Sequence, residues 1–320
     1  MNMEIVILLV SLLAIVWGAN NLVNGAVQIA QRYKISDFVI GAAIVGIGTS
    51  FPELVVSVYG AIQGKVDVAI GNVVGSNIFN VLGILGLTAV LCPIVVDKAN
   101  MRFELPFCIG VSILAILLAF NYFNGSPVMI SRIDGLMFLA FFAFYMWLSF
   151  RKNDQEIPVQ EQPSCTTTKR NPIFSALQVL VGLSVLVAGC HYFVDTAALL
   201  ATQLGVNEAF ISITLIACGT SMPEMAASLA AAFKKNTQLA LGNIIGSNIF
   251  NITFILGVSS LVSPLSGGGI VMTDYLVMLA AAIVPLILGF SGKISRVSGF
   301  LMFGGLVLYL AFLLQQQMTA

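Results

Sequence analysis

The sequence predicts an all-α integral membrane protein with ten transmembrane helices, arranged as two inverted repeats of five helices each. Three observations support this prediction: an extreme apolar composition, an uneven distribution of basic residues, and an internal repeat with a constant offset. Hydrophobic residues make up 58% of the 320 positions and charged residues only 9%. Water-soluble domains carry about a quarter charged residues, so this composition excludes a soluble domain.

Apolar segments long enough to cross a hydrocarbon core, which takes roughly 20 helical residues, recur along the whole chain. The first begins with Glu4 and has no basic stretch before it, so we expect it to stay in the mature protein rather than to be a cleaved signal. We place the ten membrane-spanning helices at residues 3–31, 36–63, 67–92, 103–122, 129–150, 173–204, 208–233, 237–263, 273–291 and 296–315.

The basic residues segregate to one side of this ten-helix arrangement. Of the 14 Lys and Arg residues, only Lys65 and Arg132 fall on one side, and all the others fall on the opposite side. Because basic loops are retained in the cytoplasm, we expect a multi-pass protein of the cell membrane with both termini outside, extracellular or periplasmic. The strongly polar stretch 151–172 is then a cytoplasmic linker, which is too short for a separate folded domain.

A repeat with an offset of 171 residues places the two halves of the chain in register. Gly-Thr-Ser-Phe-Pro-Glu at 48–53 recurs as Gly-Thr-Ser-Met-Pro-Glu at 219–224, and Gly-Asn-Val-Val-Gly-Ser-Asn-Ile-Phe-Asn at 71–80 recurs as Gly-Asn-Ile-Ile-Gly-Ser-Asn-Ile-Phe-Asn at 242–251. We therefore expect a first five-helix repeat at 1–150 and a second at 173–320. The same offset also relates Pro93 to Pro264, Gly18 to Gly189 and Asp37 to Glu208.

The two repeats are predicted to be inverted. Each contains an odd number of crossings, so the second must enter the bilayer from the opposite side to the first. Inverted repeats with Gly and Pro interruptions at matching positions indicate a secondary transporter whose site lies near the bilayer midplane, where the repeats meet. We expect helices 2, 3, 7 and 8 to be broken around such a site.

The first motif predicts a helix break. Pro52 lies within an apolar segment, although it lacks a backbone N–H and clashes with the preceding turn of a helix. Ser50 followed three residues later by Glu53, with Pro in the first turn, is typical of a helix start. We expect one helix to end near Gly48 and another to start at Ser50, and the second copy of the motif repeats the pattern. The carbonyls freed by a break at membrane depth must line a cavity or bind a ligand, and cations suit them.

Glu53 and Glu224 are carboxylates at bilayer depth, where a charge costs at least roughly 2.5–3.5 kcal/mol on insertion scales. No Lys or Arg occurs in the four helices that carry the motifs, so protons or bound cations must neutralise these groups. The alternative is that each Glu only caps its restarted half-helix. We favour ion binding because the same carboxylate occurs in both inverted copies.

The second motif forms a polar stripe. Asn72, Ser76 and Asn80 share one helix face, and the second copy repeats the stripe with Asn243, Ser247 and Asn251. Uncharged oxygens together with two carboxylates provide the hard-oxygen environment that calcium prefers, and sodium accepts the same oxygens. The alternative is hydrogen bonding between helices without any ion. Close approach of another backbone is expected at Gly71, Gly75, Gly242 and Gly246.

Other polar residues support no further chemistry. Asp195 and its repeat counterpart Asn24 lie toward helix ends, where an interfacial role is expected. His191 is the one histidine and has no nucleophile arrangement around it, which disfavours a hydrolytic enzyme, and no His or Cys cluster indicates a transition metal. We expect no enzymatic activity, no cofactor, no nucleic acid and no obligate protein partner; calcium, sodium and the lipid bilayer are the expected partners.

The two motifs, present twice, closely resemble the alpha-repeats of the sodium/calcium exchanger branch of the calcium/cation antiporter superfamily, in its prokaryotic form. The resemblance covers both repeats at full motif length. Proton/calcium exchangers of that superfamily carry Gly-Asn-x-x-Glu in place of Gly-Thr-Ser-x-Pro-Glu. This chain is therefore similar to the sodium-driven type.

The resemblance implies ion sites formed by the second, third, seventh and eighth helices, with long first and sixth helices that slide across them. It implies that Glu53 and Glu224 ligate calcium directly and share sodium ions. Asn251 stands where some archaeal and potassium-dependent relatives have Asp, which argues against potassium co-transport. The other ligands that the resemblance implies are oxygens of Thr49, Thr220, Ser50, Ser221, Ser76, Ser247, Asn80 and Asn251 and the backbone carbonyls of Gly46 and Ala217.

We therefore expect a secondary active antiporter that exchanges calcium for sodium by alternating access. Two alternatives stay open. In a proton-coupled calcium antiporter, Glu53 and Glu224 would alternate between protonation and calcium binding, whereas a cation channel would need no counter-ion. A membrane scaffold without transport would leave the duplicated carboxylates unexplained.

Overall fold

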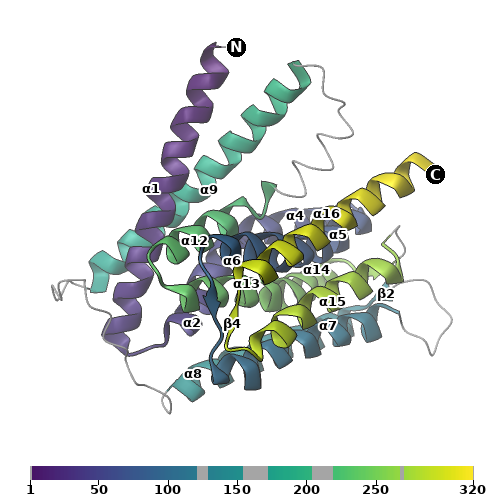
Figure 1. Ribbon diagram of the computed structural model, residues 1–320. Coiled ribbons are helices and arrows are strands. Elements are labelled where there is room, and N and C mark those ends of the chain that lie inside the picture. The colour runs from purple at the N-terminus through teal and green to yellow at the C-terminus, as the bar shows by residue number, and fades with distance from the viewer. Residues whose placement is uncertain (1, 121–128, 154–171, 204–218, 267–269, 320) are drawn as a thin grey trace. The chain divides into compact units, whose positions relative to one another are not determined.

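A computed structural model of the protein describes residues 2–120, 129–153, 172–203, 219–266 and 270–319. Over these residues the chain is almost entirely helical (Figure 1). By length and composition, eight of the described helices can each span a membrane, and the number rises to nine if a bent pair of helices at 37–62 is one span. The tenth predicted span, 208–233, lies partly outside the described residues, which contain its second part as α12 (Met222–Phe233).

The helices match the predicted segments to within a few residues at most ends, and π-helical stretches, labelled η, occur inside several of them. In chain order the described helices are α1 (Asn2–Tyr33), α2 (Asp37–Ile40), η1 (Gly41–Gly46), α3 (Ile47–Thr49), α4 (Phe51–Ile62), α5 (Val66–Ile78), η2 (Phe79–Leu85), α6 (Gly86–Leu91), η3 (Asn100–Glu104), α7 (Leu105–Ala119), α8 (Arg132–Asn153), α9 (Pro172–Gln203), α12, α13 (Thr237–Phe250), η5 (Asn251–Ile255), α14 (Leu256–Val262), α15 (Met272–Gly289) and α16 (Arg296–Thr319).

The chain forms two compact units, and each unit combines segments from both halves of the sequence. Residues 1–49 and 143–246 make up the first unit, and residues 50–142 and 247–320 make up the second. The division therefore passes through both motifs. The predicted repeats 1–150 and 173–320 and the linker 151–172 stay predictions, and residues 154–171 of the linker lie outside the described part of the chain.

In the first unit the long helices α1 and α9 lie side by side (Figure 1). Glycines allow their backbones to approach closely, as is common between membrane helices. A Cβ atom on Gly18 would lie 2.6 Å from Leu186 N, and one on Gly182 would lie 2.5 Å from Leu22 N. Because both leucine side chains are fully buried, this crossing is the centre of the apolar core of the first unit.

The second unit contains two antiparallel strand pairs that the sequence did not predict. β1 (Ile94–Val95) pairs with β4 (Lys293–Ile294), and β2 (Met129–Ile130) pairs with β3 (Leu265–Ser266). β1 directly follows Pro93 and β3 directly follows Pro264, so β1 and β3 are equivalent at the repeat offset, and each pairs with a strand of the other half of the chain. Strands of two residues carry no hydrophobic periodicity, which is why only packing reveals them.

The helix break predicted in the first motif is confirmed. α3 ends at Thr49 and α4 begins at Phe51, with Pro52 in the first turn of α4, and the two parts of this span differ in direction by 48°. In the second copy, α12 begins at Met222 with Pro223 in its first turn. The residues before Gly219 lie outside the described part of the chain.

The breaks predicted in the third and eighth helices are wrong. Between α5 and α6 the chain continues through η2, and between α13 and α14 it continues through η5. Neither helix contains a proline, so nothing removes a backbone hydrogen bond as Pro52 does. A π-helical stretch instead changes the helix locally, as is frequent at functional sites, and it begins close to Asn80 and at Asn251.

Candidate functional site

Nearly all the predicted site residues are buried inside the two units. Both Glu53 and Glu224 have side chains with no exposed surface. Ala217 lies outside the described residues, and Thr220 is half-buried. The first unit contains Gly46, Thr49, Thr220, Ser221 and Glu224, and the second contains Ser50, Glu53, Ser76, Asn80, Ser247 and Asn251.

In the second unit Asn72 ties helix α5 to the turn that carries Glu53. Its Nδ2 donates to the Glu53 backbone oxygen at 3.0 Å and to Ser57 Oγ at 2.9 Å. Because all these groups belong to the first turns of α4 or to the helix beside it, the bonds hold the start of α4 against α5. The two bonds from Asn72 therefore fix the backbone at Glu53 relative to α5.

In the first unit Asn243 makes the same two bonds at the equivalent positions. Its Nδ2 donates to the Glu224 backbone oxygen at 3.1 Å and to Ser228 Oγ at 2.8 Å. Both glutamates thus start their helices in matching hydrogen-bonded environments, one in each unit. This match is the structural counterpart of the 171-residue repeat.

Thr49 connects the first motif to Asn243 within the first unit. Its Oγ1 lies 3.0 Å from the Val45 carbonyl oxygen and 3.3 Å from both the Gly46 carbonyl oxygen and Asn243 Oδ1. A hydroxyl donates one hydrogen, so the three oxygens compete for it. The structure thereby brings Gly46 and Thr49 together with the asparagine that holds the Glu224 turn.

We expect Asn72→Ala and Asn243→Ala each to lower the free energy of unfolding by about 1–2 kcal/mol, because a buried carbonyl and a buried hydroxyl both lose a donor. The two losses should be similar, since the bonds match. Thermal unfolding of the purified protein in detergent, followed with both variants and the wild type, measures the effect. An unfolding midpoint equal to that of the wild type in both variants would contradict this role.

Four asparagines form a buried network in the second unit. Asn77 Nδ2 donates to the Asn248 backbone oxygen at 3.3 Å, and Asn248 Nδ2 donates to the Asn77 backbone oxygen at 3.1 Å. Asn80 Nδ2 donates to Asn248 Oδ1 at 3.0 Å. Asn251 Nδ2 donates to Asn77 Oδ1 and to Ser76 Oγ, both at 3.1 Å.

The side-chain oxygens of Asn80 and Asn251 remain available for a ligand. Both Oδ1 atoms are buried, and neither accepts a hydrogen bond from the residues that the structure describes. A buried carbonyl oxygen of this kind is costly unless something binds it. The sequence predicted both residues as ligands but did not single out Asn77 and Asn248; their shared position in the repeated Gly-Ser-Asn was the available signal.

The helices of the second unit that carry the predicted ligands pack against one another. α4, with Glu53, contacts α5 and η5, and α5 contacts η2 and η5. A carboxylate, two amide oxygens and serine hydroxyls therefore belong to one group of packed helices. Oxygen ligands of these types bind calcium and also suit sodium.

The close backbone approach predicted for the second copy of the Gly-Asn motif is confirmed. A Cβ atom on Gly242 would overlap the Phe38 carbonyl oxygen, and one on Gly246 would overlap Ala42. For Gly71 and Gly75 the approach stays a prediction, because residues 204–218, which correspond to 33–47 at the repeat offset, lie outside the described chain.

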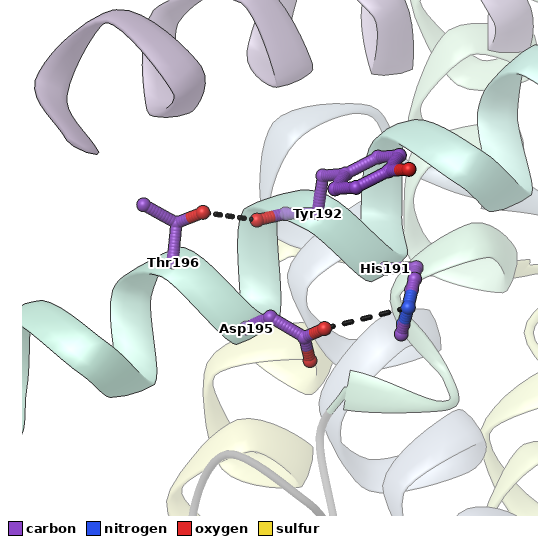
Figure 2. Close-up of polar contacts among 4 residues, drawn as sticks. All are labelled: His191, Tyr192, Asp195 and Thr196. Atoms are coloured by element: carbon purple, nitrogen blue, oxygen red, sulfur yellow. Dashed lines mark hydrogen bonds and ion pairs between the residues drawn. The ribbon is translucent and has the colours of Figure 1, made fainter. Parts of the chain in front are cut away.

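The polar residues that the sequence analysis singled out outside the motifs make contacts that do not include the predicted ligands. On α9, His191 Nε2 lies 3.4 Å from Asp195 Oδ2, and the two side chains are 69% and 62% exposed (Figure 2). Asn24 Oδ1 accepts a hydrogen bond from Lys234 Nζ at 2.9 Å, which links α1 to the end of α12. These contacts lie on helix surfaces and include none of the predicted ligands.

The chain is similar over almost its whole length to known membrane proteins. The family profile described as sodium/calcium exchanger protein matches residues 3–151 and 174–315. The putative antiporter CaxA of Alkalimonas amylolytica is 36% identical, and the match covers 92% of each chain. The sodium/calcium exchanger MaX1 of Methanosarcina acetivorans is 31% identical, and the match covers 98% of each chain.

The fold is also similar to a solved structure. A structure of the sodium-calcium exchanger NCX_Mj matches with a TM-score of 0.81 at 31% identity, covering 96% of this chain and 98% of that one. The matches extend through both motif copies and through the helices between them. The chain belongs to the sodium/calcium exchanger protein family.

Proposed function

We propose that this membrane antiporter carries calcium across the membrane in exchange for sodium, by alternating access. The observation that carries the proposal is the pair of buried amide oxygens of Asn80 and Asn251, on helices that pack beside the helix of Glu53. Calcium and sodium are the ions that such oxygens bind. Membership of an exchanger family supports the same function, and it makes the chain a transporter rather than an enzyme.

Glu53 and Glu224 are the proposed calcium ligands, and both also bind sodium. The matching bonds from Asn72 and Asn243 to their backbone turns support equal roles for the two carboxylates. The remaining proposed ligands are the oxygens of Thr49, Thr220, Ser50, Ser221, Ser76, Ser247, Asn80 and Asn251 and the carbonyls of Gly46 and Ala217. The ions are transported substrates, and no cofactor enters the proposal.

Competition for shared oxygens makes the exchange obligatory. Sodium and calcium cannot occupy the same ligands at once, and the buried carboxylates are stable only when cations neutralise them. Only the states with bound ions can then change the side of the membrane to which the site is open. In this change the long helices α1 and α9 move. The membrane voltage, worth about 2.3 kcal/mol per charge per 100 mV, favours calcium extrusion if more than two sodium ions move per calcium.

The proposed topology has ten helices in two inverted repeats, with the termini outside and residues 151–172 in the cytoplasm. The segregation of all basic residues except Lys65 and Arg132 supports this orientation. The strands that follow Pro93 and Pro264 support the repeat, since each pairs with the strand that precedes the last helix of the other half. The site would then lie at the midplane, as in other transporters with inverted repeats.

The proposal is tested with purified protein in liposomes that contain sodium. On dilution into sodium-free medium we expect radioactive calcium uptake, and we expect no uptake when sodium is equal on both sides. Uptake driven equally by a pH gradient without sodium would replace the proposal with proton-coupled calcium exchange. Calcium flux that needs no counter-ion and is too fast for alternating access would indicate a channel.

A further inference from the structure

We infer that Asn77 and Asn248 are positioning residues, which hold the side-chain oxygens of Asn251 and Asn80 toward the transported ion. The inference rests on the proposed function, because it needs an ion at those oxygens. It concerns two residues that are not proposed as ligands. Asn77 and Asn248 are the inner pair of the network, and Asn80 and Asn251 are the outer pair.

The inner pair has one possible amide orientation. Asn77 and Asn248 each donate from Nδ2 to the backbone oxygen of the other, at 3.3 and 3.1 Å. A backbone carbonyl only accepts hydrogen bonds. Turning either amide over would place its Oδ1 against a carbonyl oxygen, so the Oδ1 of each must face the other way, as an acceptor.

The Oδ1 acceptors of Asn77 and Asn248 orient the outer pair. Asn248 Oδ1 accepts from Asn80 Nδ2 at 3.0 Å, and Asn77 Oδ1 accepts from Asn251 Nδ2 at 3.1 Å. Turning over the amide of Asn80 or Asn251 would bring two oxygens together. The Oδ1 atoms of both outer residues are therefore directed away from the network, with no donor among the described residues.

Keeping these oxygens without donors costs free energy. A buried carbonyl oxygen without a donor is destabilising, and this network maintains two of them. A network built for stability alone would satisfy these oxygens, whereas an oxygen intended for a cation must be kept free of donors. Without the inner pair, the outer amides are free to turn and present Nδ2, which repels a cation. Loss of the inner pair should therefore weaken ion binding.

A set of double-mutant cycles tests the inference, because the bonds predict which pairs interact. Asn77 acts on Asn251, and Asn248 acts on Asn80. The four single alanine variants are compared with two linked doubles, Asn77→Ala with Asn251→Ala and Asn248→Ala with Asn80→Ala. They are also compared with two crossed doubles, Asn77→Ala with Asn80→Ala and Asn248→Ala with Asn251→Ala. The measurements are the half-saturating calcium concentration for sodium-dependent uptake in liposomes and direct calcium binding to the purified protein.

We expect Asn77→Ala and Asn248→Ala each to raise the half-saturating calcium concentration about tenfold, as residues that orient ligands commonly do, with a smaller change in maximal rate. In the linked doubles, the second substitution should add little, while the crossed doubles should show additive effects. The isosteric Asn77→Asp still offers a side-chain oxygen that accepts from Asn251 Nδ2. It should raise the half-saturating calcium concentration less than Asn77→Ala does, and it also tests the inference if the alanine variant does not fold.

Equal coupling in linked and crossed pairs would overturn the inference, because a merely structural contact would affect both outer asparagines alike. A lower unfolding midpoint with unchanged calcium dependence would overturn it too. Wild-type protein that shows no sodium-dependent calcium uptake would instead overturn the proposed function. Direct calcium binding to the same variants would still decide the positioning role in that case.

Discussion

Glu53→Gln and Glu224→Gln should each lower sodium-dependent calcium uptake by at least about 100-fold. Glutamine has nearly the size of glutamate but removes the charge and places a donor where the ion binds. Loss of one partner of a buried charge interaction costs about 3–5 kcal/mol, which corresponds to more than a hundredfold in affinity. Initial uptake rates in liposomes with equal amounts of reconstituted protein measure the effect.

Glu104→Gln is the matched control for these two variants. Glu104 is also a buried glutamate, with 7% of its side chain exposed, but it lies in η3, outside both motifs. We expect its uptake rate to stay within about twofold of the wild type, because Glu104 lies outside both motifs and is not among the proposed ligands. If Glu53→Gln or Glu224→Gln transported as well as Glu104→Gln does, the two carboxylates would not be the calcium ligands.

Gly242→Ala and Gly246→Ala are expected to yield little folded protein. A Cβ atom at either position would overlap Phe38 or Ala42, so α13 would have to move away from α2 and η1. Overpacking of this kind costs about 1–3 kcal/mol and sometimes more, and here the obstacle is backbone, which cannot turn aside. The move would also displace Asn243, which holds the Glu224 turn. The yield of monodisperse protein on size-exclusion chromatography and its unfolding midpoint measure the loss.

Gly110→Ala provides the control for the glycine substitutions. Gly110 lies inside the helix α7, and a Cβ atom there meets none of the described residues. Because alanine is favoured over glycine in a helix by about 0.5–1 kcal/mol, we expect an unfolding midpoint equal to or above that of the wild type. Equal midpoints for Gly110→Ala and Gly246→Ala would show that α13 and η1 can separate at no cost.

The local features of this protein were readable in the sequence. Ten spans were predicted from the lengths of apolar runs, since a bilayer of given thickness needs a helix of given length, and the described residues contain eight of them, or nine with the bent pair. The break between Thr49 and Phe51 follows from Pro52, which removes one backbone donor wherever it stands. The resemblance to the exchanger family follows from two short motifs, each present twice, and the comparisons confirm the family.

The exact positions of the oxygens were decided only by the tertiary structure. The motif spacing places Asn72, Ser76 and Asn80 on one helix face, but Asn77 lies off that face, and its partner Asn248 is in the other half of the chain. Likewise, η2 and η5 replace the expected breaks, and β1 and β3 form only because distant strands meet them. Sequence periodicity reports the local helix, whereas the direction of an amide depends on which group packs against it, and that group comes from a distant part of the chain.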